Sequence, residues 1–534
     1  MAHEFTERSL QVCREFLQTA VIIDDRAFQK PLTTPPKVAE EPGRGEQQPK
    51  ETHKASSKNE RYIDTQKLIR SFADHGIICS ALEFTAFNED SNAFINTATL
   101  ADITIIDWEM EEEKSGDNAL TLISSLLKDD FSNPQRFRLV TIYTAHEDLS
   151  EISEKVVAHV KEAHKKQLHI AQGGLRLVYQ SVVIAIYAKD PRGIPEIFQC
   201  NAVDEEGLPE KLVACFSESI SGILSNTALS AVTAIRQSTH HLLAKFHKDL
   251  DYAYLTHRAS LPKPDDAAIH LETFIAEEIK SILSSYDCIG SSASFSEIKK
   301  WIIERYSQEH EFILPNGTKL DRRHILEFLK EGCEEAVTTC LSKAKKKLLY
   351  KDFSNLLTGD AEISSICDID FSKLSVLKTR YQNRPPHLTM GIILRQLKDK
   401  SLWVCIQPKC DSVRLKGESS KFPLLPIMPG IGGASTLPKL CDDDTEAFCH
   451  ILVHPQHCQS IEFKSAEADK SQIYPQRSEE KWIFLSTEKL CFQFIAELKD
   501  EVAQNILNDF AATTARVGTN PYEWLRKSGL EKQN

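Results

Sequence analysis

The sequence lacks the marks of a secreted, membrane-spanning or nucleic-acid-binding protein. No apolar run reaches the roughly 18–20 residues that span a bilayer, and the first ten residues carry acids where a secretory signal carries positive charge. Lys and Arg number 64 against 77 Asp and Glu, so the net charge of −13 gives no overall basic surface for nucleic acid. We therefore expect a cytoplasmic protein with no membrane partner and no nucleic-acid partner.

Short motifs of several enzyme classes are also missing. The chain has no Gly-rich phosphate-binding loop, no nucleophile elbow and no His-Glu-x-x-His segment. Its 14 cysteines are scattered over 534 residues without the density of a disulfide scaffold, so we expect reduced thiols that pack as small apolar residues. The length exceeds what a single hydrophobic core accommodates, which predicts several domains.

Changes in composition along the chain indicate four parts. We expect an α/β domain over 1–195, helical regions over 196–290 and 291–370, and an α+β domain over 371–534. Residues 29–59 are rich in Pro, Gly, Lys, Glu and Ser and almost devoid of large apolar side chains, which predicts a disordered insertion inside the first domain.

The helical and C-terminal parts carry a few local signals. Prolines at 262 and 264 interrupt a long amphipathic pattern, and Ser294 followed by Glu297 is typical of a helix N-cap. The last part alternates short apolar runs with Pro, Gly and Ser loops, as short strands do, and we expect a closing helix over 491–515.

Apart from the insertion, the first domain alternates continuously apolar runs with amphipathic helices. This pattern predicts a doubly wound parallel sheet of five strands that is covered by helices on both faces. The strands are expected at 20–25, 77–84, 103–107, 138–145 and 181–190. Ligands of such sheets bind beyond the carboxyl ends of the strands.

Carboxylates stand at two of these strand ends. Asp24 and Asp25 end the first strand and Asp107 ends the third, and these strands are neighbours where the strand order of such a sheet reverses. Three carboxylates at one place repel one another unless a divalent cation lies between them, and Mg²⁺ suits an all-oxygen site. The fourth strand ends near Thr144, a hydroxyl donor, and the fifth near Lys189, a cation. Both side chains suit the negative charge that a phosphoryl group would add to one of the carboxylates.

The constellation resembles the receiver domain of response regulators, most specifically in "DWEM" at 107–110 followed by "SGDNAL" at 115–120. The resemblance covers roughly residues 15–195. It implies that Asp107 is the phosphoacceptor, that Asp24 and Asp25 bind Mg²⁺ together with Asp107, that Thr144 is the switch hydroxyl and that Lys189 pairs with the phosphoryl group.

The chain departs from the family pattern at three places. Lys189 is followed by Asp190 and only then by Pro191, and Ile186 occupies the spacing of the switch aromatic, so that Tyr187 comes one residue late. An extra segment at 165–180, which contains Gly173 and Gly174, predicts a hairpin before the fifth strand. These departures concern the conventional output face and leave the acidic pocket intact.

The resemblance implies a phosphorylation-controlled signalling protein that is loaded by a histidine-kinase-like or other ATP-binding phosphodonor and acts on a protein effector. Two alternatives stay open. The receiver could be a degenerate docking module in a scaffold protein, or the acidic pocket could hydrolyse a phosphate ester with Glu109, two residues after Asp107, as the proton donor.

Histidines and cysteines also gather in the C-terminal part, at Cys449, His450, His454, His457 and Cys458. Zinc is one interpretation, but no Cys-x-x-Cys pair accompanies them and neighbouring residues of a strand point to opposite faces, so core and turn roles are favoured.

Three further features have a structural and a functional interpretation. Cys405 and Cys410 have the wrong spacing for a zinc knuckle, and burial is the simpler role for Cys410. The basic run at 343–351 is interpreted as a solvated helix end rather than as a phosphate-backbone contact. His240 and His241 suggest a phosphorelay site, but partly exposed helix positions are favoured.

Two C-terminal segments, at 407–415 and 515–526, are similar to segments of bacterial proteins from conflict and phage-defence loci. This resemblance implies a receiver protein that is encoded beside an ATP-binding, kinase-like partner.

Overall fold

The computed structural model of the chain forms two compact units, Met1–His310 with Asp321–Gly332 and Glu311–Leu320 with Cys333–Asn534. It describes residues 4–28, 63–85, 91–110, 115–132, 137–163, 169–171, 174–179, 182–189, 194–340, 353–381, 383–415, 417–432, 435–441, 446–466, 471–479 and 481–514. The insertion expected over 29–59 lies outside these residues, and the four domain boundaries remain predictions.

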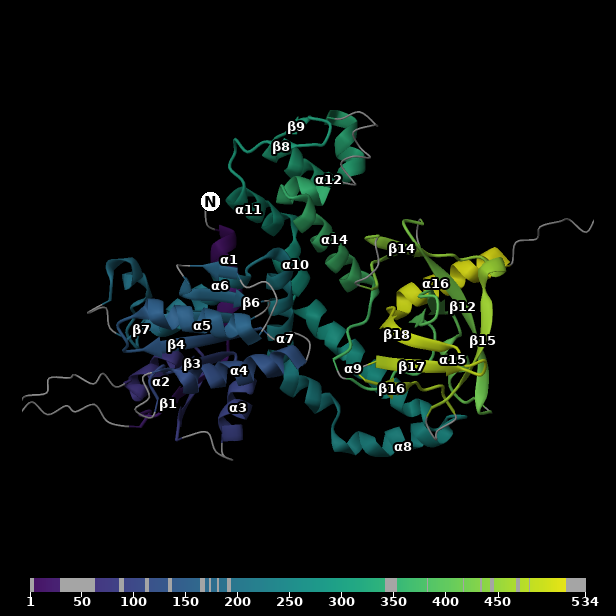
Figure 1. Ribbon diagram of the computed structural model, residues 1–534, viewed down its shortest axis with the longest axis horizontal. Coiled ribbons are helices and arrows are strands. Elements are labelled where there is room, and N and C mark those ends of the chain that lie inside the picture. Colours follow the sequence, from purple (N-terminus) through teal and green to yellow (C-terminus); the bar gives the residue numbers. More distant parts are fainter. Residues whose placement is uncertain are drawn as a thin grey trace, which may run out of the picture. The chain divides into compact units, whose positions relative to one another are not determined.

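The first unit contains the parallel five-stranded arrangement that the sequence predicts (Figure 1). The parallel strands run in the order β2-β1-β3-β4-β7. Their bounds are Thr19–Asp24 (β1), Ile78–Glu83 (β2), Ile103–Ile106 (β3), Arg138–Thr144 (β4) and Val182–Ala188 (β7). The strand order reverses between β1 and β3, which brings their carboxyl ends together at one rim.

A hairpin extends this sheet beyond β7. β5 (His169–Ala171) and β6 (Arg176–Tyr179) are antiparallel, and β6 pairs antiparallel with β7, so the predicted hairpin is confirmed. Because β6 takes the free side of β7, the last parallel strand is not the edge of the sheet.

Helices cover both faces of the sheet, and each face has its own apolar core. The core of one face contains residues of α3, α4 and α5, and that of the other contains residues of α1, α2, α6 and α7. Their bounds are Glu4–Phe16 (α1), Thr65–Asp74 (α2), Ser91–Leu100 (α3), Asp117–Ser132 (α4), Leu149–Ala163 (α5), Leu208–Ile220 (α6) and Ile223–Lys245 (α7). Strands β1, β3, β4 and β7 are therefore buried on both sides, as their continuously apolar runs require, whereas the edge strand β2 is partly exposed.

The rest of the first unit is mainly helical. A short 3₁₀ segment at Lys248–Leu250 leads into α8 (Asp251–Ser260), and α9 (Asp266–Ser285) begins after the two prolines. α10 (Cys288–Ala293) and α11 (Phe295–Arg305) follow. The predicted cap is confirmed, because Ser294 Oγ accepts a hydrogen bond from the backbone N–H of Glu297.

In the chain, a small hairpin and further helices follow α11 before the second sheet begins. The hairpin pairs β8 (Phe312–Ile313) with β9 (Lys319–Leu320), and α12 (Arg322–Cys340) and α14 (Ala361–Val376) follow in the chain. No helix among the described residues has both the length and the apolar character needed to cross a membrane.

The second unit is built around a nine-stranded antiparallel sheet with a helix, α16 (Asp500–Thr514). β11 pairs with both β10 and β12, so six of the strands form a closed circuit, β10-β11-β12-β15-β17-β18. The bounds are Ile392–Gln396 (β10), Leu402–Cys405 (β11), Ser419–Pro429 (β12), Thr436–Pro438 (β13), Phe448–Ile451 (β14), Gln459–Lys464 (β15), Gln476–Ser478 (β16), Lys481–Ser486 (β17) and Cys491–Glu497 (β18).

Alternate residues of these strands belong to two different apolar cores. Phe422 and Leu424 of β12 join an aromatic-rich core, whereas Leu425 and Ile427 join the core that contains Ala503 of α16. The aromatic core thus fills the inside of the closed circuit, and the other core lies on its outer face beneath α16.

The expected start of the closing helix is wrong. Residues Cys491–Glu497 form strand β18, which pairs with β10 on one side and β17 on the other, and the helix begins only at Asp500. Hydrogen bonding to two neighbours prevails here over an apolar pattern that fits either structure, which is how tertiary context overrides local propensity.

Strand β12 lies in a proline-containing stretch of the kind that predicts a loop. It contains Pro423, Pro426 and Pro429. Proline removes a donor from the ladder but keeps its acceptor. The carbonyl of Pro423 accepts from the N–H of Ile406 (3.1 Å) and that of Pro426 from the N–H of Leu452 (3.0 Å), so β12 remains paired through its acceptors.

Candidate functional site

Three aspartates meet at the rim where β1 and β3 end. Asp24 is the last residue of β1, and Asp107 directly follows β3, held by a hydrogen bond from its N–H to the carbonyl of Ile23 (3.0 Å). One carboxylate oxygen from each of Asp24, Asp25 and Asp107 lies within 4.8 Å of the others. The topology thus brings together the acids that the sequence singles out.

Lys189 reaches these acids from β7. Its Nζ lies 3.2 Å from Asp107 Oδ1 and 3.6 Å from Asp24 Oδ2, and its side chain is only 5% exposed. The backbone N–H of Lys189 donates to the carbonyl of Thr144 (2.8 Å), which fixes the point where the lysine leaves the strand. A buried ammonium between two carboxylates is well placed to accompany further negative charge.

Thr144 ends β4, the strand between β3 and β7. It is fully buried, and its Oγ1 accepts a hydrogen bond from the backbone N–H of His146 (3.1 Å). The hydroxyl is therefore engaged with the loop that follows β4.

Burial dominates the electrostatics of the pocket. It raises the pKa of Asp107 from 3.8 to about 7, and the nearby charge of Asp24 adds to the rise. Lys189 and the N–H of Trp108, which donates to Asp107 Oδ1 (2.9 Å), act in the opposite direction. The Asp107 carboxylate is costly to ionise in this setting unless more positive charge is supplied.

The two motifs "DWEM" and "SGDNAL" pack against each other beneath the pocket. Trp108 is fully buried, and a Cβ added to Gly116 would lie 2.1 Å from its ring. Gly116 also has φ +80°, a conformation that favours glycine. Lys155 Nζ lies 6.0 Å from the centroid of the Trp108 ring and donates to the carbonyl of Ser115 (3.3 Å). This packing holds the segment after Asp107 in place.

The donor set fits a hard divalent cation. Asp24, Asp25 and Asp107 offer only oxygen ligands, which Mg²⁺ prefers. Two cations lie beside these carboxylates: Lys189 contacts Asp24 and Asp107, and Nε of the half-buried Arg26 lies 3.8 Å from Asp25 Oδ2. Among the described residues, no other group of three or more His, Cys, Asp or Glu side chains converges in this way.

Residues 16–192 match the family model described as the response receiver domain. This part of the chain is a response receiver domain. No curated protein and no solved structure matches the chain. Receiver domains in general serve phosphorylation-type signalling, bind Mg²⁺ at an acidic cluster and interact with phosphodonor kinases and effectors.

The departure from the family pattern at residues 186 and 187 can be followed in the packing of β7. Ile186 is fully buried in the core on the α3, α4 and α5 side, and Tyr187 belongs to the core on the opposite face. The aromatic side chain therefore cannot take the place of Ile186. Asp190 and Pro191 lie outside the described residues.

Sequence reasoning missed Tyr143, which lies beside the receiver pocket. Its ring centroid is 5.9 Å from Lys189 Nζ, and its hydroxyl donates to the carbonyl of Val203 (2.9 Å) in the segment after β7. The signal was present, since Tyr143 directly precedes Thr144. The direction in which the Tyr143 side chain points, however, depends on the register of β4 with β7.

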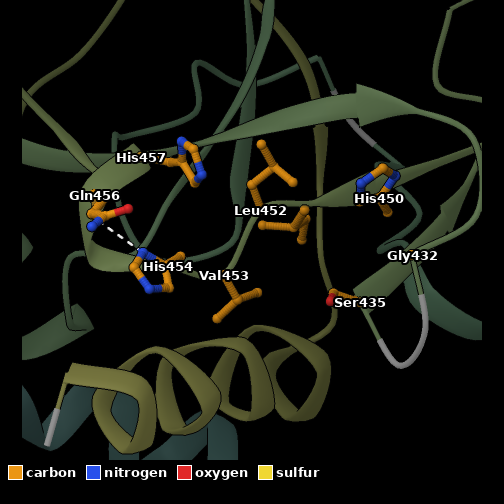
Figure 2. Close-up of a pocket in the computed structure, with 9 residues that line it drawn as sticks. Gly432, Ser435, His450, Leu452, Val453, His454, Gln456 and His457 are labelled. Atoms are coloured by element: carbon orange, nitrogen blue, oxygen red, sulfur yellow. Dashed lines mark hydrogen bonds between the residues drawn. The ribbon is translucent and has the colours of Figure 1, made fainter. Parts of the chain in front are cut away.

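The Cys and His residues near 450 do not form a comparable site. Cys449 is buried and His450 half-buried on β14, as the alternation of a strand predicts. A hollow of about 420 Å³ contains His450, His454 and His457 in its lining, and Figure 2 shows His450 well apart from the other two. His454 Nδ1 accepts from the N–H of Gln456 (3.2 Å), which is a turn role.

The remaining cysteines, histidines and basic residues that the sequence singles out are located as follows. Cys405 is buried on β11, but Cys410 is exposed, so the expected burial of Cys410 is wrong. Cys410 lies on the short helix Lys409–Ser412, where Ser412 instead faces inward. His240 and His241 are exposed on α7, and the basic run at 343–351 lies outside the described residues.

Proposed function

We propose that the chain is a phosphorylation-controlled signalling protein whose receiver domain accepts a phosphoryl group on Asp107. The observation that supports this most directly is the contact of Lys189 Nζ with Asp107 Oδ1 and Asp24 Oδ2 inside one buried pocket. An isolated buried carboxylate needs one counter-ion, whereas this pocket gathers three acids, two of which share one buried lysine. Such an arrangement suits a site that handles changing negative charge.

In the proposed reaction an ionised oxygen of Asp107 attacks the phosphorus of a donor. The new bond joins the Asp107 oxygen to phosphorus, and the bond between phosphorus and the donor breaks, with its electron pair leaving on the donor. Lys189 Nζ is positioned to pair with the transferred phosphoryl oxygens, and the buried Thr144 hydroxyl can turn from the N–H of His146 toward them.

Asp24, Asp25 and Asp107 would hold Mg²⁺. When bound, the ion supplies positive charge that offsets both the acids and the phosphoryl oxygens. The chain's own residues supply the rest: Trp108, next to Asp107, packs against Gly116, and the N–H of Trp108 fixes one carboxylate oxygen of Asp107.

We further propose that the phosphodonor is a histidine-kinase-like or other ATP-binding protein and that the helical and C-terminal parts transmit the change to a protein effector. Phosphate adds roughly two negative charges, which is enough to bias a two-state element. The resemblance of the C-terminal segments to bacterial conflict and phage-defence proteins supports a role of this kind in phage defence.

Intact mass after exposure to a small acyl phosphate with Mg²⁺ tests the proposal. The wild-type chain should gain one phosphoryl group, and Asp107→Asn should gain none. Glu109→Gln should label like the wild type, because this side chain has no part in the proposed transfer. A folded wild-type sample that stays unmodified, or labelling that survives Asp107→Asn, would refute phosphorylation at this pocket.

The second candidate is a docking module that is not phosphorylated. The hairpin that occupies the free side of β7 favours it, because the conventional output edge is altered. In that case Asp107→Asn would leave recruitment of the effector unchanged. If Asp107→Asn lost recruitment of the effector together with phosphoryl labelling, the docking interpretation would be excluded.

A further inference from the structure

The helical segment between Ser238 and Tyr286 buries almost none of its apolar side chains. We call residues 239–285 the helical arm; it comprises the end of α7, the 3₁₀ segment, α8 and α9. All buried residues of α7 lie at or before Ser238, α8 has none, and Ala267 is the one buried hydrophobic residue among the described side chains of the arm. The exposed large apolar residues of the arm are Leu243, Phe246, Leu250, Tyr252, Leu255, Phe274 and Ile275.

Polar contacts nevertheless define the arm as a folded hairpin. Ser238 Oγ donates to the hydroxyl of Tyr286 (3.3 Å), and Lys245 forms an ion pair with Glu278, so α9 returns antiparallel along α7. His257 and His270 are hydrogen bonded ring to ring at 2.8 Å, which joins α8 to the start of α9. Figure 1 shows α8 beyond the end of α7 and α9 running back toward α10 (teal).

The base of the arm is fixed to the receiver sheet. Arg236 of α7 donates to both oxygens of the buried Asp102 (2.9 and 3.2 Å) and to the carbonyl of Phe16 (2.8 Å). Asp102 directly precedes β3, the strand that Asp107 follows. The base of the arm is therefore anchored to the receiver domain, because α7 continues from Arg236 into the arm without a break.

We propose that the helical arm is a self-association surface and that its partner is the arm of a second copy of this chain. An antiparallel helix pair cannot enclose a core by itself, whereas two such pairs related by a two-fold axis form a four-helix arrangement that does. The proposal goes beyond the phosphoryl chemistry and does not depend on it.

The exposed area matches what a dimer needs. Leu243 is 63% exposed, Tyr252 78% and Phe274 52%, and the other four side chains range between 38% and 57%. With large apolar side chains of about 200 Å² each, the seven expose on the order of 800 Å² per copy, the share that one partner contributes to a standard interface.

The charges of the arm favour a second copy over a partner of one charge sign. The arm forms ion pairs within itself, Lys245 with Glu278, Lys280 with Glu277 and Arg258 with Asp265, so these charges are already balanced inside one copy. A uniformly acidic or uniformly basic peptide would have to compete with these pairs, whereas the arm of a second copy, which is balanced in the same way, would not.

Analytical ultracentrifugation of the full chain over a range of concentrations tests the proposal. The wild type should form a dimer, and Leu243→Glu, Phe274→Glu and Leu255→Lys should each raise the half-dimer concentration at least ten-fold. Leu224→Glu is the matched control, because Leu224 is a leucine of the same helix with nearly the same exposure (60%) outside the arm, and it should dimerise like the wild type. Leu255→Lys guards against misfolding, because α8 holds no buried residue.

A wild type that stays monomeric at every concentration would overturn the proposal, as would a dimer that all three arm variants leave intact. Slow hydrogen exchange of the arm in a monomeric wild type would instead assign its cover to another part of the same chain and would also overturn it. Asp107→Asn should dimerise like the wild type, so failure of the phosphorylation proposal and failure of this one remain distinguishable.

Discussion

Two groups of side chains in this protein have the residue types of a metal site, and the structure treats them in opposite ways. Asp24, Asp25 and Asp107 are far apart in the chain, yet their oxygens converge within 4.8 Å. Cys449 and His457 belong to one short stretch, yet no three ligands of that stretch converge among the described residues. Closeness in the sequence is thus a poorer predictor of a metal site than positions that the sheet topology brings together.

The cause lies in how each sheet directs its side chains. Parallel strands deliver their carboxyl ends to one rim, so acids that end neighbouring strands meet there. Along a single strand successive side chains point to opposite faces, which separates Cys449 from His450. The turn at Pro455–His457 then fixes His454 as a cap for its own backbone.

The largest effect that would sharpen this comparison is on Mg²⁺ binding. Replacing both Asp24 and Asp25 with Asn removes two of the three carboxylates, and we expect the Mg²⁺ affinity measured by calorimetry to fall by at least about 100-fold, more than the 10–100-fold typical of outer-shell losses. The control is the double variant His454→Ala and His457→Ala, which should bind Mg²⁺ like the wild type. Equal losses in the two variants would mean that the acidic rim is not the site.

The next effect concerns the support of the acidic pocket. Gly116→Ala sets a Cβ 2.1 Å from the buried Trp108 ring at φ +80°, and we expect it to lower the free energy of unfolding by about 2–4 kcal/mol through combined overpacking and backbone strain. Urea denaturation measures this loss.

Gly76→Ala is the control for backbone strain alone. Gly76 has φ +75° but nothing within 4 Å of an added Cβ, so the loss should be about 1–2 kcal/mol. If Gly116→Ala cost no more than Gly76→Ala, the Trp108 ring would be free to move and the support described here would be absent.

Much of the receiver domain could be predicted because its signals are local and repeated. Four of the five parallel strands, all except β2, are continuous apolar runs that end in or directly before a residue of the pocket, so Asp24, Asp107, Thr144 and Lys189 followed from the same rule. Tyr143 was not predicted, because the direction of its side chain depends on the register between β4 and β7, which no local pattern contains.

The closed sheet of the second unit was harder to predict for the same physical reason. β12 carries three prolines and stays paired through its carbonyls, and β18 has an apolar pattern that also fits a helix. Both are strands because of neighbours distant in the chain, such as β15 and β10. Pairing of this kind is a property of the whole sheet, and a local window of sequence does not contain it.

A smaller effect is the pH dependence of the acidic rim. Burial raises the pKa of Asp107 to about 7, so the metal-free folded protein holds a proton that an arriving cation must displace. Mg²⁺ affinity should therefore rise from pH 6 to pH 8 and then level off, and calorimetry in two buffers of different ionisation enthalpy should show proton release at pH 7.

The same shift has a stability consequence with a definite sign. Because the folded pKa of Asp107 lies above its ordinary value of 3.8, the metal-free protein binds more protons folded than unfolded between about pH 4 and pH 7. This contribution to stability is present below pH 4 and is lost as the pH rises through 7. Asp107→Asn should abolish both the proton release and this loss; a proton release that persists in the variant would assign the titration to another group.

The smallest expected effect is at the histidines of the second unit. Each imidazole of His454 and His457 sits at a partly open surface, and the backbone contact of His454 is local, so His457→Ala should change the free energy of unfolding by less than about 0.5 kcal/mol. Equilibrium dialysis against Zn²⁺ should show the same bound metal in wild type and variant. A stoichiometric Zn²⁺ that is lost in His457→Ala would contradict the contrast between the acidic rim and this stretch. Ligands would then converge on an ion although neither strand ends nor turn geometry brings them together.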